Sequence, residues 1–319
     1  MNVKNSVLLG TLGRYSDRFH EFQPFKSLED RLKTSAKIPR VHGVEPVYPQ
    51  DIGHSGEQVE LIQNADLPVS AVNVNVKGEA EFKYGSFTNP DQAVREKTVT
   101  YLKTAMDIAV DLGTNMVSVC PLIDGFDHAF QVDHSKQWQW FIEGLKGAAA
   151  HRDDVRISIE YKPFESRNHI IAPNMSTTLL ACEQTGFDNV GVTMDVGHAI
   201  SGGENPAAAL ALGHSMNRLF YVHFNDNDRR WDWDTLPGSV NLWETLETLY
   251  YVRKLNWSGW FAYDVFTRHG DPAEALDATF EIMENLNAFI DKIGMDTLQE
   301  MTETQQPAAA YRELIKAML

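Results

Sequence analysis

Three short apolar runs in the second half of the chain decide the fold: Arg156-Ile-Ser-Ile-Glu160, Val190-Gly-Val-Thr-Met-Asp-Val196 and Leu219-Phe-Tyr-Val-His-Phe224. They are rich in β-branched and aromatic residues and too short for typical helices, so each predicts a strand. The residues that flank their polar positions are apolar, as in a parallel strand that is covered on both faces. The pattern therefore predicts a buried parallel sheet.

Similar runs recur on both sides of this segment: Val7–Leu12, Val41–Val47, Pro68–Val76, Met116–Leu122 and Trp260–Val265. Amphipathic stretches separate the runs. The clearest, Pro90–Leu112, places its apolar residues in one stripe at helical spacing, behind a predicted N-cap at Asn89. Further stretches of this kind are Trp138–Ala149, Leu242–Leu255 and Pro272–Ile293. Eight strands alternating with helices predict an α/β fold of the (β/α)₈ TIM-barrel class, with residues 1–294 as the barrel domain.

The sequence after the first predicted strand argues against the competing fold, an open doubly wound sheet. An open doubly wound sheet would need a glycine-rich phosphate turn after its first strand, and the Gly10–Arg14 stretch lacks the GxGxxG spacing.

Beyond Gly294, residues 295–319 are predicted to form a C-terminal helical extension. Its last part is interpreted either as a frayed terminus or as a helix, Ala308–Leu319, that packs on a neighbouring subunit.

The composition narrows the class of partner. The 319 residues include 28 Lys and Arg against 44 Asp and Glu, which gives a formal net charge of −16. Phosphates would be repelled by this charge, which argues against nucleic acid or an anionic membrane surface as a partner. The chain has two cysteines, no apolar stretch near the ~20 residues of a membrane span and no secretory signal pattern. These features predict a cytoplasmic protein.

Four consecutive runs end in residues that can bind a metal ion: Glu160, Asp195, His223 and Asp264. The carboxyl ends of barrel strands meet at one mouth, where carboxylates in apolar surroundings would repel one another without a cation. A mostly oxygen site with one imidazole suits Mg²⁺ or Mn²⁺, and Co²⁺ is also possible. Local salt bridging of four unrelated residues is the alternative interpretation.

A second group adjoins the first. Asp232 and Asp234 stand two residues apart and point the same way in extended backbone, and His198 lies three residues after Asp195. With Asp195 as a bridge, these residues predict a second divalent ion close to the first. A solvated acidic turn is the alternative for Asp232 and Asp234, and a hydrogen-bonded structural role is the alternative for His198.

Lys162 is the residue predicted to take part in catalysis. It lies two residues after Glu160 and so shares a strand face with it. In a carboxylate-rich mouth its ammonium can hydrogen-bond a substrate carbonyl or hydroxyl oxygen and stabilise developing negative charge. Simple neutralisation of the neighbouring carboxylates is the alternative interpretation.

These residues belong to motifs that resemble the xylose isomerase superfamily. The motifs are Lys83-Tyr-Gly-Ser-Phe-Thr-Asn-Pro-Asp91, Glu160-Tyr-Lys-Pro-Phe-Glu165, Asn189-Val-Gly-Val-Thr-Met-Asp-Val-Gly-His198, Leu219-Phe-Tyr-Val-His-Phe-Asn225 and Trp231-Asp-Trp-Asp-Thr-Leu-Pro-Gly238. They follow the family's order over about residues 68 to 266. The resemblance implies a (β/α)₈ barrel that binds two divalent ions and interconverts an aldose and a ketose.

Carried over residue by residue, the resemblance assigns roles. The ligands of the first, structural ion would be Glu160, Asp195, His223 and Asp264, and those of the second, catalytic ion Asp195, His198, Asp232 and Asp234. Lys162 matches the lysine that polarises the sugar's O1 carbonyl. The pair of Asp195 and His223 is closer to the bacterial L-rhamnose isomerases than to xylose isomerases proper. Because family members usually form dimers or tetramers, a homodimer or homotetramer is also implied.

Two positions depart from the family's pattern. Val47 stands where the second strand would carry the histidine of a His–Asp pair that assists ring opening, and Cys120 replaces a tryptophan near the end of strand four. Both departures favour a sugar that is already largely open, with the branched pentose apiose as the leading example. The lack of a Lys and Arg cluster at the mouth favours a free sugar over a sugar phosphate.

The predicted function is a divalent-metal-dependent aldose–ketose isomerase that moves a hydride between C2 and C1 of a free sugar. Glu45, Asp124 and Glu165 are candidates for hydrogen bonds to sugar hydroxyls, and Phe126 for an apolar wall. The alternative is a one-metal ketose 3-epimerase that removes and returns a proton, although this chemistry expects a glutamate where the chain has Asp264. A sugar-binding module without catalysis is a third class, and it has no need of a carboxylate cluster.

Overall fold

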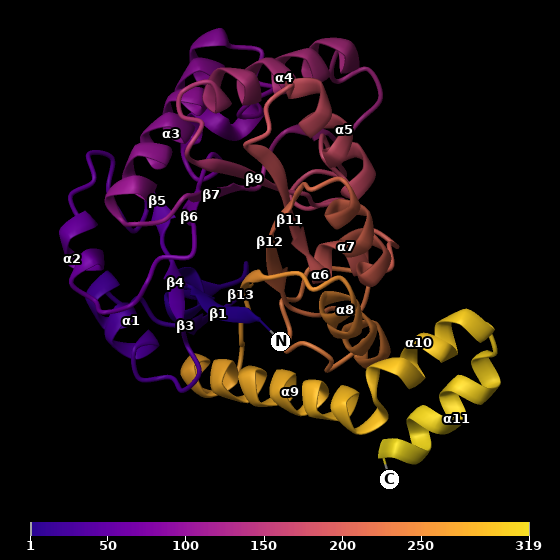
Figure 1. The fold of residues 1–319 in the computed structure, drawn as a ribbon. Coiled ribbons are helices and arrows are strands. Elements are labelled where there is room, and N and C mark those ends of the chain that lie inside the picture. Colours follow the sequence, from indigo (N-terminus) through magenta and orange to yellow (C-terminus); the bar gives the residue numbers. More distant parts are fainter. Residues whose placement is uncertain (1, 319) are drawn as a thin grey trace.

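A computed structural model describes residues 2–318 and shows a parallel β-barrel surrounded by helices (Figure 1). Its strands are β1 (Val3–Leu8), β4 (Gly43–Glu45), β5 (Val47–Tyr48), β6 (Val72–Val74), β7 (Met116–Val119), β9 (Arg156–Glu160), β11 (Val190–Asp195), β12 (Leu219–Phe224) and β13 (Gly259–Tyr263). Their order in the sheet is β4-β1-β13-β12-β11-β9-β7-β6-β5. The predicted α/β barrel class is confirmed.

Pro46 divides the second barrel strand into β4 and β5. Proline has no backbone N–H to give to a ladder. β4 pairs with β1 and also forms an isolated parallel bridge between Val44 and Val69, just before β6, while β5 pairs with β6. The Pro46 carbonyl still accepts a hydrogen bond from Asn73 N at 2.9 Å. Because β4 and β5 are successive in the chain, the ring is closed through this strand.

Helices follow the strands and cover the outside of the barrel (Figure 1). They are α1 (Leu28–Ser35), α2 (Val59–Gln63), α3 (Gln92–Asp111), α4 (His134–Ala149), α5 (Met175–Thr185), α6 (Val196–Ser201), α7 (Pro206–Ser215), α8 (Leu242–Lys254) and α9 (Pro272–Ile293). The predicted cap of α3 was wrong, because Asp91 rather than Asn89 accepts the hydrogen bond from Ala93 N (2.9 Å). Every helix in the described part of the chain is too short or too polar to span a lipid bilayer.

The first strand begins earlier than predicted. β1 covers Val3–Leu8 and pairs with β13, while Leu9–Leu12 form a turn of 3₁₀ helix, η1. Lys4, Asn5 and Ser6 interrupt the apolar residues of β1, so a search for a continuous apolar run places the strand too late. By contrast, the predictions for β9, β12 and α9 match the structure residue for residue.

Short ladders build up the rim where the barrel strands end. In the loop after β1, β2 (Tyr15–Ser16) pairs with β3 (Glu21–Gln23). The loops after β7 and β9 are joined by β8 (Gly125–Phe126) and β10 (His169–Ile170). A 3₁₀ helix, η2 (Ala80–Tyr84), lies in the loop after β6. These additions surround the carboxyl-terminal face, which is the face where barrel proteins carry their sites.

The C-terminal extension is helical and projects from the barrel (Figure 1). It consists of α10 (Met295–Thr304) and α11 (Pro307–Met318), and no residue of α11 is buried. The Tyr311 ring meets Trp243 of α8 edge-on at 5.4 Å between centroids. Cavities of about 810 and 460 Å³ lie beside α11, against α8, α9 and α10. Packing of this helix on a neighbouring subunit and a domain boundary after residue 294 stay predictions.

Candidate metal centre at the barrel mouth

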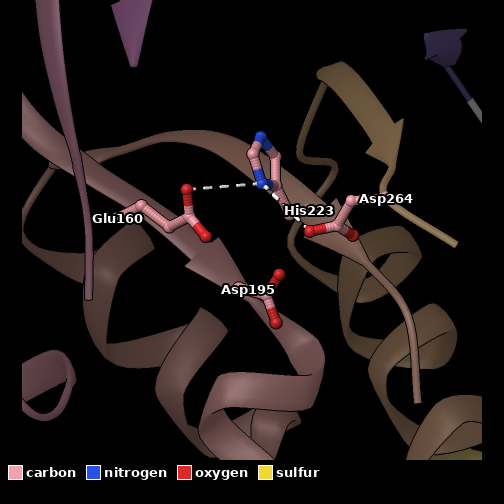
Figure 2. A group of neighbouring side chains, drawn as sticks. All are labelled: Glu160, Asp195, His223 and Asp264. Atoms are coloured by element: carbon pink, nitrogen blue, oxygen red, sulfur yellow. Dashed lines mark ion pairs between the residues drawn. The ribbon is translucent and has the colours of Figure 1, made fainter. Parts of the chain in front are cut away.

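Four side chains converge at the carboxyl ends of neighbouring strands (Figure 2). Each offers one ligand atom, and these atoms all lie within 4.8 Å of one another. We call this group the first cluster: Glu160 of β9, Asp195 of β11, His223 of β12 and Asp264 directly after β13. All four side chains are buried. The structure thus brings together the residues predicted for the first ion.

His223 turns one ring nitrogen toward the carboxylates of the first cluster. Its Nδ1 lies 3.6 Å from Glu160 Oε2 and 3.7 Å from Asp264 Oδ2, and it has no hydrogen-bond partner within residues 2–318. The other nitrogen, Nε2, lies 3.1 Å from Glu45 Oε2. A buried, unpartnered imidazole nitrogen among carboxylate oxygens is the arrangement that a metal ion would complete.

Asp195 is held by the start of the next helix and by Asn225. The Asp195 carboxylate caps α6 by accepting a hydrogen bond from His198 N at Oδ1 (2.7 Å). Asn225 Nδ2 donates both to Asp195 Oδ2 and to Asp264 Oδ1, each at 2.9 Å. Gly197 makes room for this amide, since a Cβ at position 197 would lie 1.8 Å from Asn225 Oδ1. Sequence reasoning missed Asn225, although it lies two residues after His223 at the end of the same strand.

The charges of the first cluster are unbalanced without a cation. Burial, together with the Asp195 carboxylate, raises the pKa of Asp264 well above its usual range, and burial also raises the pKa of Asp195. For Glu160, burial acts in the same direction, but the imidazoles of His223 and His198 outweigh it and lower its pKa to about 2. Three carboxylates and one imidazole nitrogen without a partner fit a divalent cation such as Mg²⁺ or Mn²⁺.

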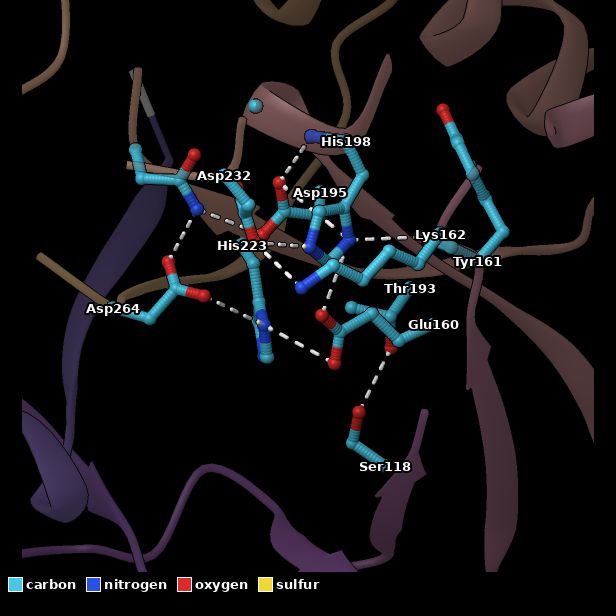
Figure 3. A network of polar contacts seen from close by, with 12 residues as sticks. Ser118, Glu160, Tyr161, Lys162, Thr193, Asp195, His198, His223, Asp232 and Asp264 are labelled. Atoms are coloured by element: carbon cyan, nitrogen blue, oxygen red, sulfur yellow. Dashed lines mark hydrogen bonds and ion pairs between the residues drawn. The ribbon is translucent and has the colours of Figure 1, made fainter. Parts of the chain in front are cut away.

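The residues predicted for a second ion are only partly assembled (Figure 3). His198 Nε2 lies 3.0 Å from Asp232 Oδ2, while Nδ1 lies 2.9 Å from the Tyr161 carbonyl oxygen. Burial would lower the pKa of His198, but the carboxylates of Asp195 and Asp232 outweigh it and raise this pKa to about 9. Burial and the nearby carboxylates of Asp232 and Asp264 raise the pKa of Asp234 well above its usual range. We call His198, Asp232 and Asp234 the second set.

Lys162 forms an ion pair with the second set through Asp232. Its Nζ lies 2.8 Å from Asp232 Oδ2 and 2.8 Å from Glu165 Oε2, and Figure 3 shows it directed toward the same carboxylate as His198. Burial would lower the pKa of Lys162, but these two carboxylates outweigh it and hold the pKa above its usual range. The ammonium is therefore charged and stands beside the first cluster.

A cavity of about 260 Å³ opens between the two groups. Its acidic and basic lining comprises Lys77, Glu160, Lys162, His198, His223, Asp232, Asp234 and Asp264. Sequence reasoning missed three polar residues of the lining, Asn73, Asn75 and Lys77, which lie in or just after β6. Their position at a strand end is the signal that would have found them, since the same rule identified Lys162. Apolar residues complete the wall: Leu8, Val47, Leu122 and Phe266.

The four predicted substrate contacts lie outside the residues that line this cavity. Glu45 is fully buried behind His223, and Asp124 is buried and accepts hydrogen bonds from Ser86 and Thr88. Phe126 lies 4.7 Å, between ring centroids, from His134 and from His169. Glu165 pairs with Lys162. Contact of these four residues with a substrate stays a prediction.

The fold and the site define an α/β barrel with a candidate metal centre at the carboxyl ends of its strands. The model of the xylose isomerase-like TIM barrel family matches residues 37–286, and the chain belongs to this family.

Two relatives are xylose isomerases. That of Thermus thermophilus is 28% identical over 189 residues, which cover 57% of this chain and 49% of the relative. That of Agrobacterium fabrum is 25% identical over 183 residues, which cover 56% and 42%. The chain thus spans about half the length, or less, of these relatives.

Solved structures show the same barrel. A D-tagatose 3-epimerase-like protein superposes with a TM-score of 0.69 at 17% identity, covering 91% of this chain and 99% of that one. L-ribulose 3-epimerase superposes with a TM-score of 0.68 at 16% identity, covering 95% and 98%. At such identities the likeness concerns the fold.

Proposed function

We propose that the protein is a divalent-metal-dependent isomerase that interconverts an aldose and its ketose, with a free sugar as substrate. One observation carries the proposal: the Lys162 ammonium lines the same small cavity as three residues of the first cluster, Glu160, His223 and Asp264. An ammonium beside a cation site is suited to a sugar's carbonyl and hydroxyl oxygens. The similarity to xylose isomerases over about half of the chain supports the same class of reaction.

Two groups of residues would hold the cations. Glu160, Asp195, His223 and Asp264 would bind the first, and Asp195 together with His198, Asp232 and Asp234 would bind the second. Mg²⁺ or Mn²⁺ suits these ligands, and Co²⁺ is also compatible with them. Bound there, the cations would supply Lewis-acid charge that polarises a carbonyl and stabilises developing negative charge on oxygen.

Residues of the chain would assist the proton transfer that accompanies the hydride shift. In the isomerisation, the hydrogen on C2 moves to C1 with its electron pair, and one proton moves overall from the C2 hydroxyl to O1. Lys162 would donate a hydrogen bond to O1. Asp232, whose Oδ1 has no hydrogen-bond partner within residues 2–318, would accept a hydrogen bond from the C2 hydroxyl and so orient it. The apolar wall of the cavity would exclude water from the migrating hydride.

The cavity favours a small open-chain sugar. About 260 Å³ is below the 300–1,000 Å³ typical of pockets for drug-sized ligands, so it suits a monosaccharide. Val47 lines the cavity and offers no group that could help open a sugar ring. A short-chain or branched aldose such as apiose fits both features. Asn75 and Lys77 also line the cavity and would bind the remaining hydroxyls.

A one-metal ketose 3-epimerase is the second candidate. Within residues 2–318, the first cluster is the single group of three or more His, Cys, Asp or Glu side chains whose ligand atoms all lie within 4.8 Å of one another. A reaction that needs one cation would be served by this cluster alone. The names of the structurally similar epimerases agree with this candidate, although at 16–17% identity their likeness concerns the fold.

A substrate screen in D₂O tests the proposal. Protein reloaded with Mn²⁺ or Mg²⁺ is incubated with a panel of free aldoses and ketoses that includes apiose, and chelated protein is the control. We expect one aldose–ketose pair to interconvert in the loaded sample, with little solvent deuterium in the product. Inversion at C3 with extensive deuterium uptake at that carbon would establish the epimerase instead. A homodimeric or homotetrameric state and a cytoplasmic location stay predictions.

A further inference from the structure

We infer that Glu45 is a positioning residue that selects which nitrogen of His223 faces the first cluster. The inference rests on the proposed function only in requiring that the first cluster bind a cation. Glu45 ends β4, is 0% exposed, and lies with Oε2 3.1 Å from His223 Nε2. The two residues are 178 positions apart in the chain and meet across the barrel. Glu45 therefore supports the site from behind rather than facing the cavity.

The hydrogen bonds around Glu45 determine the direction of this contact. Tyr221 OH donates to Glu45 Oε2 at 2.8 Å, and Asn73 Nδ2 donates to Oε1 at 2.9 Å. A buried carboxylate that gathers donors in this way acts as an acceptor, so His223 Nε2 must carry the hydrogen in the third contact. The Tyr221 hydroxyl is itself held by Ser70 Oγ at 2.7 Å. The acceptor is thus held by side chains from two other strands, β12 and β6.

The consequence for His223 follows from the chemistry of the imidazole ring. A neutral imidazole carries one N–H, so a hydrogen on Nε2 leaves Nδ1 with its lone pair. Nδ1 is the atom that has no partner and faces the carboxylates of Glu160 and Asp264. A carboxylate behind a ligating histidine fixes the tautomer and the ring orientation and raises the basicity of the ligating nitrogen. Glu45 is suited to do all three.

The substitution Glu45→Gln tests this role because it keeps the shape and removes the negative charge. Asn73 can turn its amide to accept from the new side-chain NH₂, so the remaining change falls on His223 and Tyr221. We expect the affinity of the first cluster for Mn²⁺ to fall about 10–100-fold, measured by the electron paramagnetic resonance signal of free Mn²⁺ during titration. The ¹⁵N resonance of His223 Nε2 in Mg²⁺-loaded protein is expected to shift, because its acceptor changes from a carboxylate to an amide.

Tyr221→Phe is the matched control. It removes another donor to the same carboxylate oxygen but leaves Glu45 charged and in contact with His223. We expect its Mn²⁺ affinity to stay within about threefold of wild type, even where thermal stability drops as much as in Glu45→Gln. Equal losses of affinity in both variants would overturn the inference, as would wild-type Mn²⁺ binding by Glu45→Gln. If the wild-type protein itself bound no Mn²⁺, the proposed metal site would fail first, so the two failures are distinguishable.

Discussion

The first cluster and the second set lie side by side but differ in what their polar atoms already contact. In the first cluster, His223 Nδ1 has no hydrogen-bond partner in the described chain, and the nearest carboxylate oxygens lie 3.6 and 3.7 Å away. In the second set, Asp232 Oδ2 is already in contact with His198 Nε2 at 3.0 Å and with Lys162 Nζ at 2.8 Å. Within residues 2–318, the first cluster thus presents an unpaired nitrogen to a cation. In the second set, Asp232 is already paired with the ammonium of Lys162.

We therefore expect Lys162 to affect the binding of any second ion at Asp232. While the ammonium pairs with Asp232, it competes with a divalent ion for the same carboxylate. The contact with Glu165, also 2.8 Å, gives Lys162 a second carboxylate to remain with when Asp232 takes up a cation. We therefore expect tight binding of one ion at the first cluster and weaker binding of another at the second set.

The largest effect is expected from Lys162→Met. Loss of the group that would stabilise charge on O1 should lower kcat by about 10²–10³-fold. The same change frees Asp232, so Mn²⁺ should bind the second set more tightly while the first cluster is unaffected. Steady-state kinetics and Mn²⁺ titration check both parts. Full activity would remove Lys162 from the mechanism, and unchanged weak-site affinity would contradict competition at Asp232.

Asp264→Asn should affect the first cluster in two opposite ways. Loss of a ligand should weaken Mn²⁺ binding by about 100-fold or more, beyond the cost of losing a supporting residue. The metal-free protein should gain about 1 kcal/mol of stability, ~2 °C in Tm, because one of the mutually repelling carboxylates is gone. Calorimetry of chelated and Mn²⁺-loaded samples measures both. A metal-free variant less stable than metal-free wild type would argue against repulsion in the first cluster.

Asp232→Asn tests whether the second set binds an ion at all. We expect one of two bound ions to be lost, because the substitution removes the negative charge of Asp232 and weakens its contact with His198. Elemental analysis of protein equilibrated with millimolar Mn²⁺ gives the stoichiometry, and Asp264→Asn provides the comparison. Two ions in both proteins would show that Asp232 is not needed for the second ion, whereas a single ion in wild type as well would leave the one-metal epimerase as the better description.

The smallest effect is expected from Lys77→Met. Lys77 lines the cavity, and its charge helps to lower the pKa of Glu160, so its ammonium lies near the first cluster. Loss of a hydrogen bond to a sugar hydroxyl should raise KM about 10-fold with kcat little changed. Mn²⁺ should bind the first cluster ~2–3-fold more tightly, because a nearby positive charge is removed. Preference for a phosphorylated sugar that disappears in this variant would contradict a neutral substrate.

The barrel and the residues at its mouth could be predicted because they depend on local sequence. Glu160, Asp195, His223 and Asp264 each follow or end a buried apolar run, and parallel strands place such residues at one rim. The role of Glu45 could not be predicted in the same way, since its partner His223 is 178 residues distant and the contact depends on barrel closure. The sequence places Glu45 at a strand end, and from this position it was predicted to contact the substrate. The sequence does not show that Glu45 lies behind the His223 ring, outside the cavity lining.

Other differences have local causes. Pro46 divides the second barrel strand into β4 and β5, whereas the apolar run Val41–Val47 was predicted to be a single strand. Asp91 caps α3 although Asn89 has an equally suitable side chain, because α3 begins at Gln92 and Asn89 Oδ1 already accepts a hydrogen bond from Asp91 N. Asn73 lies within β6, and Asn75 and Lys77 follow it. This strand has only three residues, which made its end hard to locate.

Burial along β11 and α11 has a consequence for local opening of the native state. All six residues of β11 are buried, and none of α11 is. Amide hydrogens of β11 should exchange with solvent only on global unfolding, whereas those of α11 should exchange through fraying that costs little free energy. The chain therefore contains its own fast and slow reference segments for hydrogen-exchange mass spectrometry. Protection gained by α11 at rising protein concentration, with β11 unchanged, would report directly that the helix becomes covered.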